Sequence, residues 1–153
     1  MGGVAERLAA VGLTVPPVAA PVASYVPAVA HGGFVFTSGQ LPFVDGALVA
    51  TGKVGAEVSP EEAAELARTA ALNAVAAVGS VVDLDTVVRV VKVGVFVASA
   101  PGFTGQPAVA NGASQLLADA FGEAGVHARS AVGVAELPLG SPVEVEVQVA
   151  TRA

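Results

Sequence analysis

The chain has 153 residues, of which 54% are hydrophobic and 13% are charged, and it carries a net charge of −6 with no cysteine. The lack of thiols excludes disulfides, thiolate zinc sites and cysteine nucleophiles, and the two distant histidines, His31 and His127, offer no metal-ligand spacing. The seven basic residues are scattered, which argues against a nucleic-acid partner and against an anionic membrane surface.

This length fits a single domain, residues 1–153, that buries about two-thirds of its unfolded surface. The high apolar fraction favours a homo-oligomer in which partner subunits cover part of that surface. Residues 4–12 are expected to form a short helical turn within an N-terminal lead-in, residues 1–24. Prolines interrupt the uncharged run that follows, so no continuous apolar helix is expected and the protein is predicted to be cytoplasmic.

Two β-strands are expected at residues 25–30 and 34–38, joined by a His-Gly-Gly turn whose glycines supply positive φ angles. A Ser-Gly-Gln segment at 38–40 ends the second strand. Its small residues let backbone N–H groups approach a ligand, although such a segment is more often only a turn. Residues 45–46, Asp-Gly, mark another turn.

The first long helix is predicted to begin after Ser59, where a capping hydroxyl, a proline at the first helical position and Glu62 form a capping box. Apolar residues recur at helical spacing until Gly79 ends the helix. The β-branched run Val87–Ala98 is typical of a central strand. A second helix is expected at about residues 107–121.

The segment from Ala128 to Ala150 is predicted to form two strands that are joined by a turn and pair antiparallel. Alternation in the second strand places valines on one face and Glu144 and Glu146 on the other. The predicted order is β-β-α-β-α-β-β, an α+β domain with two helices packed on one face of a mixed sheet.

Arg129 and Glu144 are candidate functional residues, because antiparallel pairing would bring them near each other across neighbouring strands. A guanidinium can bind a substrate carboxylate through paired hydrogen bonds, and a nearby carboxylate can accept or donate a proton. Two alternatives stay open. The acidic face of the strand is simply hydrated, or Arg129 forms an ordinary salt bridge with Glu144 or Glu146.

From about Tyr25 to Arg152 the chain resembles the Rid family of imine deaminases, also called the YjgF family and once labelled L-PSP endoribonucleases. Four segments carry the resemblance: Tyr25-Val26, Thr37-Ser38-Gly39-Gln40-Leu41-Pro42, Asn111, and Ala128 to Val132 running on to Leu137-Pro138 and Val143 to Glu146. The last segment is the most specific, because residue types and the Arg-to-Glu spacing both agree. The resemblance implies a homotrimer of chorismate-mutase-like α+β subunits with a pocket at each subunit interface.

The resemblance also implies hydrolysis of 2-imino or 2-enamino acids to 2-oxo acids and ammonia, without a metal or cofactor. Arg129 matches the residue that binds the substrate carboxylate and Glu144 the one that guides the attacking water, with Glu146 as the main rival. The positions that match the pocket lining are Tyr25, Ser38, Gly39 and Asn111. Ala131 stands where active members commonly have Cys, so we expect an altered pocket lining there.

The residues and the resemblance together are compatible with three functions. The leading hypothesis is an imine or enamine deaminase that acts on a small-molecule substrate. The second is a non-catalytic binder of small carboxylates that serves as a sensor or regulatory subunit. The third is the endoribonuclease of the old family label, which the acidic composition disfavours.

Overall fold

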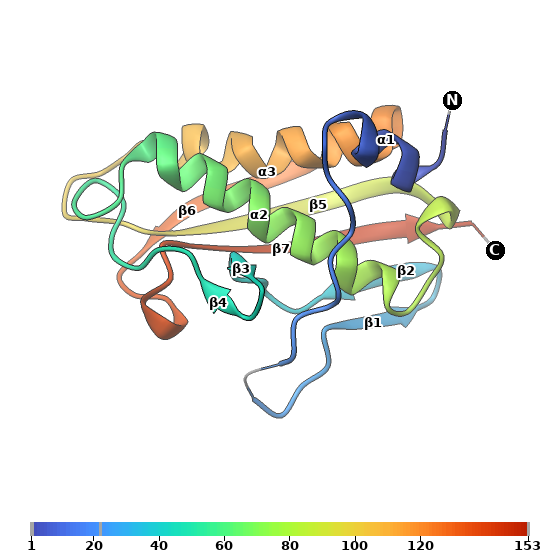
Figure 1. Cartoon of the computed structure of the whole chain (residues 1–153), viewed down its shortest axis with the longest axis horizontal. Coiled ribbons are helices and arrows are strands. Elements are labelled where there is room, and N and C mark those ends of the chain that lie inside the picture. Colours follow the sequence, from blue (N-terminus) through green and yellow to red (C-terminus); the bar gives the residue numbers. More distant parts are fainter. Residues whose placement is uncertain (1, 22, 153) are drawn as a thin grey trace.

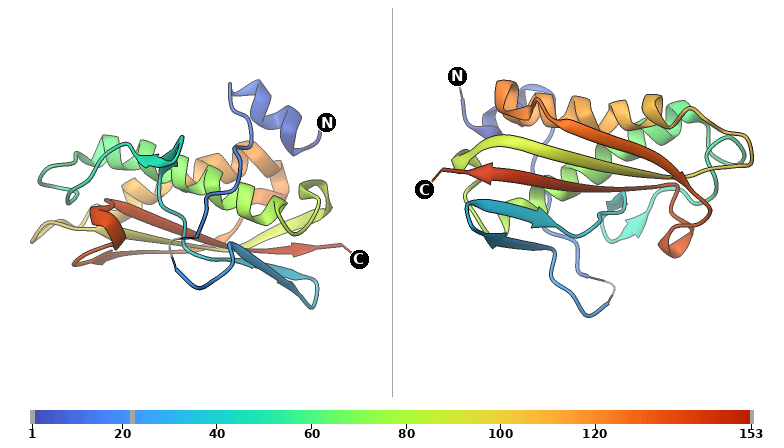
Figure 2. Two further views of the ribbon diagram at one scale, coloured as in Figure 1. Left: turned by 60° about the horizontal axis from the view of Figure 1, so that its bottom comes forward. Right: turned by 180° about the vertical axis from the view of Figure 1, so that it is seen from behind.

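A mixed five-stranded sheet in the order β1-β2-β7-β5-β6 forms one layer of the molecule (Figure 1). The computed structural model describes residues 2–21 and 23–152. The strands of the sheet are β1 (Ala28–His31), β2 (Phe34–Thr37), β5 (Val87–Ala98), β6 (Ala128–Val134) and β7 (Val143–Thr151). The long helices α2 (Pro60–Gly79) and α3 (Gln106–Phe121) cover one face and leave the other uncovered (Figure 2). The predicted α+β domain with two helices on one face of a mixed sheet is confirmed.

An N-cap fixes the start of α2, and a glycine in α3 lets the two long helices pack closely together. Ser59 Oγ accepts a hydrogen bond from the backbone N–H of Glu62 at 3.1 Å, so the predicted N-cap of α2 is confirmed. Helices α2 and α3 approach so closely that a Cβ on Gly112 would lie 1.9 Å from the carbonyl oxygen of Ala64. Glycine at this position therefore sets the spacing of the helix layer.

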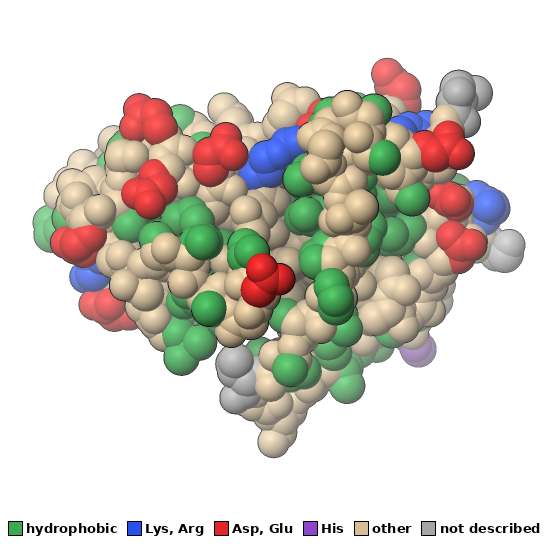
Figure 3. Space-filling view, viewed as in Figure 1, with side chains coloured by type: hydrophobic (Ala, Val, Ile, Leu, Met, Phe, Trp, Pro, Cys, Tyr) green, Lys and Arg blue, Asp and Glu red, His purple; other side chains and the backbone are tan. Residues whose placement is uncertain are grey.

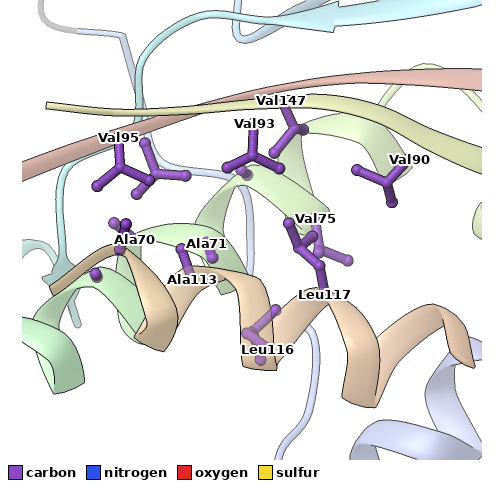
Figure 4. Packing of buried hydrophobic residues seen from close by; sticks show 14 of the residues in the cluster. Ala70, Ala71, Val75, Val90, Val93, Val95, Ala113, Leu116, Leu117 and Val147 are labelled. Carbon is purple, nitrogen blue, oxygen red and sulfur yellow. The ribbon is translucent and has the colours of Figure 1, made fainter. Parts of the chain in front are cut away.

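The core fills the space between the helix layer and the covered face of the sheet (Figure 4). Buried valines of β5 and β7 face small and branched residues of α2 and α3; those labelled in Figure 4 include Val93, Val95, Val147, Ala70, Ala71, Ala113 and Leu117. Alanines on the helices bring the backbones near the sheet, and the valines fill the remaining volume. The alternation in β7 has the same cause, since Val143, Val145, Val147 and Val149 are all buried.

The predicted antiparallel pairing of the last two strands is wrong. Strand β5 lies between them: β6 pairs with β5 in parallel, and β7 pairs with the other side of β5 antiparallel. The parallel pairing follows from the β5-α3-β6 order, because a helix that packs on the sheet returns the chain in the same direction. Residues 135–142, which include the 3₁₀ turn Pro138–Gly140, then cross the end of β5 to reach β7.

The N-terminal half holds two hairpins and a short helix. Helix α1 spans Val4–Ala10, and Gly12 follows it with φ of 78°. The β1–β2 turn uses Gly32 and Gly33 at φ of 59° and 81°, as predicted. However, β1 begins at Ala28, so Tyr25 precedes the strand, which was expected to start there. The predicted turn at residues 45–46 joins two further strands, β3 (Phe43–Val44) and β4 (Ala47–Leu48).

Two more 3₁₀ turns lie later in the chain, at Leu84–Thr86 and Gly122–Gly125.

Charged side chains are sparse on the surface. On the face drawn in Figure 3, acidic side chains are dispersed, and Lys and Arg side chains occur in small separate groups. Across residues 2–21 and 23–152, no helix has the length and apolar character needed to cross a bilayer.

Candidate functional site

Arg129 lies on the edge strand β6, and its side chain turns towards the helix layer. The residue is in register with Val93, which is fully buried beneath the helices. Its Nη1 donates hydrogen bonds to Asn111 Oδ1 at 2.8 Å and to Ser114 Oγ at 3.1 Å. Its Nη2 lies 3.4 Å from the carbonyl oxygen of Pro107. Three neutral acceptors on α3 therefore hold the guanidinium.

No carboxylate lies within salt-bridge distance of Arg129 in the described part of the chain; the ion pairs found there are Lys53–Glu136 and Arg68–Asp119. The alternative in which Arg129 forms a salt bridge with a glutamate of β7 is therefore wrong for the single chain. Asn111 and Ser114 engage Nη1 and Pro107 engages one proton of Nη2, while no described residue accepts from Nε–H, so Nε–H and the other Nη2–H are open to a ligand. These two donors lie side by side and match the two oxygens of a carboxylate.

Two residues that the sequence analysis did not select as functional extend this group. Ser114 Oγ lies 2.9 Å from His127 Nε2, and His127 Nδ1 is hydrogen-bonded to the carbonyl oxygen of Gly125. A spacing signal was present in the sequence for both. His127 precedes Arg129 by two residues, as side chains on one face of a strand do, and Ser114 follows Asn111 by three, as neighbours on one helix face do. We call Asn111, Ser114, His127 and Arg129 the cation cluster.

Glu144 points to the uncovered face of the sheet, since its strand neighbours Val143 and Val145 are buried on the other face. The backbone of Gly39 runs beside its carboxylate: a Cβ built on Gly39 would lie 2.0 Å from Glu144 Oε1. Glycine is therefore required here to leave room for the acid. Burial raises the pKa of Glu144 above its ordinary value, and the neighbouring charge of Glu146 raises it further.

Ser38 and Tyr25 lie near Gly39, Ser38 as its neighbour in the chain and Tyr25 across a small cavity. Ser38 Oγ donates to the carbonyl oxygen of Val26 at 2.6 Å, which ties the end of β2 to the segment before β1. Tyr25 is 43% exposed and lines a small cavity together with Gly39. We call Tyr25, Ser38, Gly39 and Glu144 the carboxylate cluster.

The two clusters do not meet within one chain. β5 separates β6 from β7, and Arg129 and Glu144 face opposite sides of the sheet. The expectation that these residues lie near each other across neighbouring strands is therefore wrong. Ala131 lies two residues after Arg129 on the helix side and packs against the core. Within the described ranges, no group of three or more His, Asp or Glu side chains is placed to hold a metal ion.

Comparison with known proteins places this arrangement in a family. The family described as Endoribonuclease L-PSP matches residues 17–151. Protein TCP17 of Trypanosoma cruzi is 47% identical over 150 residues, which cover 97% of this chain and 94% of that protein. The crystal structure of Atu1372 from Agrobacterium tumefaciens, a protein described as of unknown function, is 40% identical with a TM-score of 0.91 and covers 97% and 92% of the two chains. Escherichia coli TdcF, crystallised with bound serine, is 26% identical with a TM-score of 0.67 and covers 89% and 94%. The chain thus belongs to the endoribonuclease L-PSP family, the family of the E. coli YjgF protein.

Proposed function

We propose that this protein hydrolyses 2-imino and 2-enamino acids to 2-oxo acids and ammonia, in a pocket that two copies of the chain build together. The observation that carries the proposal is the state of Arg129. Its guanidinium is held by neutral acceptors, has no carboxylate partner among the described residues, and gives no hydrogen bond to them through Nε, which leaves the Nε–Nη2 edge to bind a ligand.

Arg129 would bind the carboxylate of the substrate. In a 2-imino acid the carboxylate is bonded to the carbon of the C=N group, so a bidentate grip on the carboxylate also fixes the electrophilic carbon. One charge-assisted hydrogen bond contributes about 1.5–3 kcal/mol, which is enough to orient the substrate. The bound serine in the related TdcF is an α-amino acid, and it supports a ligand of this size and charge pattern.

Glu144 would guide the attacking water. Water adds to the iminium carbon and loses a proton to the carboxylate, which gives a carbinolamine. The protonated carboxylate returns this proton to the nitrogen, and ammonia leaves as the hydroxyl loses its proton to give the 2-oxo acid. Burial and Glu146 raise the pKa of Glu144, which makes its ionised form a stronger base. The iminium carbon is already electrophilic, so the reaction requires neither a covalent nucleophile nor a cofactor.

Assembly would complete the pocket. Because Arg129 and Glu144 face opposite sides of one sheet, a site that contains both needs the cation cluster of one subunit and the carboxylate cluster of another. Apolar side chains on the uncovered face support such packing: Val29, Phe34, Phe36 and Val132 are each 43–52% exposed. We take the assembly to be the homotrimer that the family resemblance implies.

A coupled assay tests the proposal. A threonine dehydratase supplies 2-iminobutanoate and its enamine, and the release of 2-oxobutanoate is followed with and without this protein. We expect wild type to accelerate release and Arg129→Ala to lose that effect while it forms the same oligomer. Gln115→Ala, on the same helix but outside both clusters, is the control. No acceleration with imines from several amino acids would contradict the proposal.

A non-catalytic carboxylate binder is the second candidate, because Arg129 and Glu144 lie on opposite faces of the sheet in one chain, so the guanidinium could bind a carboxylate without the acid. In that case wild type binds 2-oxobutanoate in calorimetry, Arg129→Ala does not, and neither accelerates imine hydrolysis. Ribonuclease activity, which the family description names, has little support from a chain with a net charge of −6.

A further inference from the structure

Arg129 is held by a chain of hydrogen bonds that runs through Ser114 to His127. Arg129 Nη1 lies 3.1 Å from Ser114 Oγ, and Ser114 Oγ lies 2.9 Å from His127 Nε2. We propose that Ser114 and His127 are positioning residues that fix the guanidinium in the orientation needed to bind the substrate carboxylate. This inference rests on the carboxylate-binding role of Arg129 in the proposed function.

The direction of each hydrogen bond follows from the groups involved. The carbonyl oxygen of Gly125 can only accept, so the bonded Nδ1 of His127 carries a proton. In the neutral ring Nε2 then has a lone pair, and it accepts the hydroxyl proton of Ser114. With its proton committed to the ring, Ser114 Oγ presents its lone pairs to Arg129. The histidine therefore sets the orientation of the serine, and the serine that of the guanidinium.

The neutral character of these acceptors matters for ligand binding. A carboxylate in place of Ser114 or Asn111 would hold the guanidinium equally well, but it would compensate the positive charge that the substrate needs. A hydroxyl and an amide oxygen orient Nη1 and leave the full charge for the substrate. Because both acceptors use Nη1, they also select which edge of the guanidinium, Nε with Nη2, faces the ligand.

Close packing keeps His127 within reach of α3. A Cβ on Gly125 would lie 2.4 Å from the carbonyl oxygen of Leu117, so the turn before β6 lies directly against the helix. The turn places His127 beside Ser114, one helical turn before Leu117. Ser114 and His127 are both partly buried, which shields their hydrogen bonds from competing water.

The test measures binding and turnover with the full-length oligomer. The variants are Ser114→Ala, His127→Phe and the double variant, with Gln115→Ala as the matched control. Calorimetry gives the Kd for 2-oxobutanoate, and the dehydratase-coupled assay gives KM and kcat. We expect Ser114→Ala to raise Kd and KM about tenfold, or about 1.4 kcal/mol, with kcat changed less than about threefold. The double variant should match Ser114→Ala, because His127 acts through the serine.

Loss of folded protein would reduce kcat and leave KM unchanged, so that pattern would overturn a positioning role. Equal Kd and KM in wild type and Ser114→Ala would also overturn it, as would additive losses in the double variant. The ¹⁵N chemical shifts of the His127 ring provide an independent check. A proton on Nε2 alone would reverse the direction of the His127–Ser114 hydrogen bond and contradict the proposal. Wild type that binds no 2-oxobutanoate and turns over no imine would refute the proposed function itself. Wild type that binds without turnover still tests the inference through Kd.

Discussion

Gly39→Ala should show whether activity depends on the position of the Glu144 carboxylate, because this substitution displaces the side chain without removing it. The added Cβ would lie 2.0 Å from Oε1, 2.7 Å from Cδ and 2.9 Å from Cγ of Glu144. To reach an ordinary contact of 3.4 Å, the Oε1 atom must move about 1.4 Å. Gly39 does not have a positive φ angle, so alanine fits the backbone there. The side chain of Glu144 is flexible and can rotate away, and we therefore expect a loss of stability of about 1 kcal/mol or less.

The effect on catalysis should be much larger than the effect on stability. A displacement of about 1 Å at a reacting group can lower the rate about 10²-fold. We expect kcat for imine hydrolysis to fall by about this factor in Gly39→Ala, while Kd for 2-oxobutanoate changes little because Arg129 is untouched. The dehydratase-coupled assay and calorimetry measure the two effects, and thermal unfolding controls for stability.

Gly94→Ala is the matched control, because its Cβ would lie 3.1 Å from Glu146 instead of Glu144. This substitution should leave kcat within about threefold of wild type. Full activity in Gly39→Ala would refute the role of Glu144. A large loss in Gly94→Ala with little loss in Gly39→Ala would transfer that role to Glu146, the rival carboxylate on the same strand.

Three further predictions concern charge and packing. Because burial and Glu146 raise the pKa of Glu144, the native state binds its proton more tightly than the unfolded state does, and the ionised acid lowers stability as pH rises through that raised pKa. Glu144→Gln should therefore unfold at a higher temperature than wild type at pH 7, with the difference lost below the ordinary carboxyl pKa. Glu146→Gln should shift the acidic limb of the kcat profile to lower pH. Gly112→Ala should lower the free energy of unfolding, measured with denaturant, by about 3 kcal/mol or more. The new Cβ would lie 1.9 Å from the backbone oxygen of Ala64, which cannot rotate away as a side chain can. An unchanged free energy of unfolding would mean that the two helices separate easily.

Local chemistry made most of the fold predictable from the sequence. The hydroxyl of Ser59, the glycine pair at 32–33 and the valine run of β5 act on their nearest neighbours, and each of these features was predicted correctly. The order of these elements also predicted the layer arrangement, with two helices on one face of a mixed sheet.

The pairing of β6 was not predicted, because turn residues show where a chain reverses and not which strand it joins. A signal was nevertheless present: a strand, a helix and a second strand in sequence favour parallel pairing of the two strands. The turn residues at 137–142 favour a hairpin instead, and in this fold they mark a crossover past the end of β5. This one error also misplaced Arg129 relative to Glu144, since their apparent proximity depended on pairing between β6 and β7.

The contacts around Arg129 were predictable only in part. Asn111 came from the family resemblance, and the structure places its amide oxygen on the guanidinium. The sequence indicates no role for His127, which lacks metal-ligand spacing, and no motif marks Ser114. Their spacing from Arg129 and Asn111 indicates only a shared face; the contacts themselves depend on how tightly the turn at Gly125 packs on α3, which is a tertiary feature.

The division of the candidate site between two faces of the sheet leads to a complementation experiment. If each pocket takes Arg129 from one subunit and Glu144 from its neighbour, Arg129→Ala and Glu144→Gln should both be inactive alone, yet a mixed oligomer contains some pockets with both native residues. In a cyclic assembly of equally mixed chains, half of the subunits supply the arginine and half of their neighbours supply the glutamate. About one quarter of the pockets are then intact, so about one quarter of wild-type activity should return after the variants are unfolded and refolded together.

Mixing the folded variants without subunit exchange is the control, and it should restore nothing. If instead one subunit supplied both residues to its own pocket, no mixture would contain an intact site and the refolded mixture would stay inactive. That result would contradict the shared pocket even if wild type proves to be an imine deaminase. Sedimentation of the same samples tests whether the assembly is required. Recovered activity should follow the oligomer and vanish on dilution to monomer, because a lone chain keeps its arginine and its glutamate on opposite sides of one sheet.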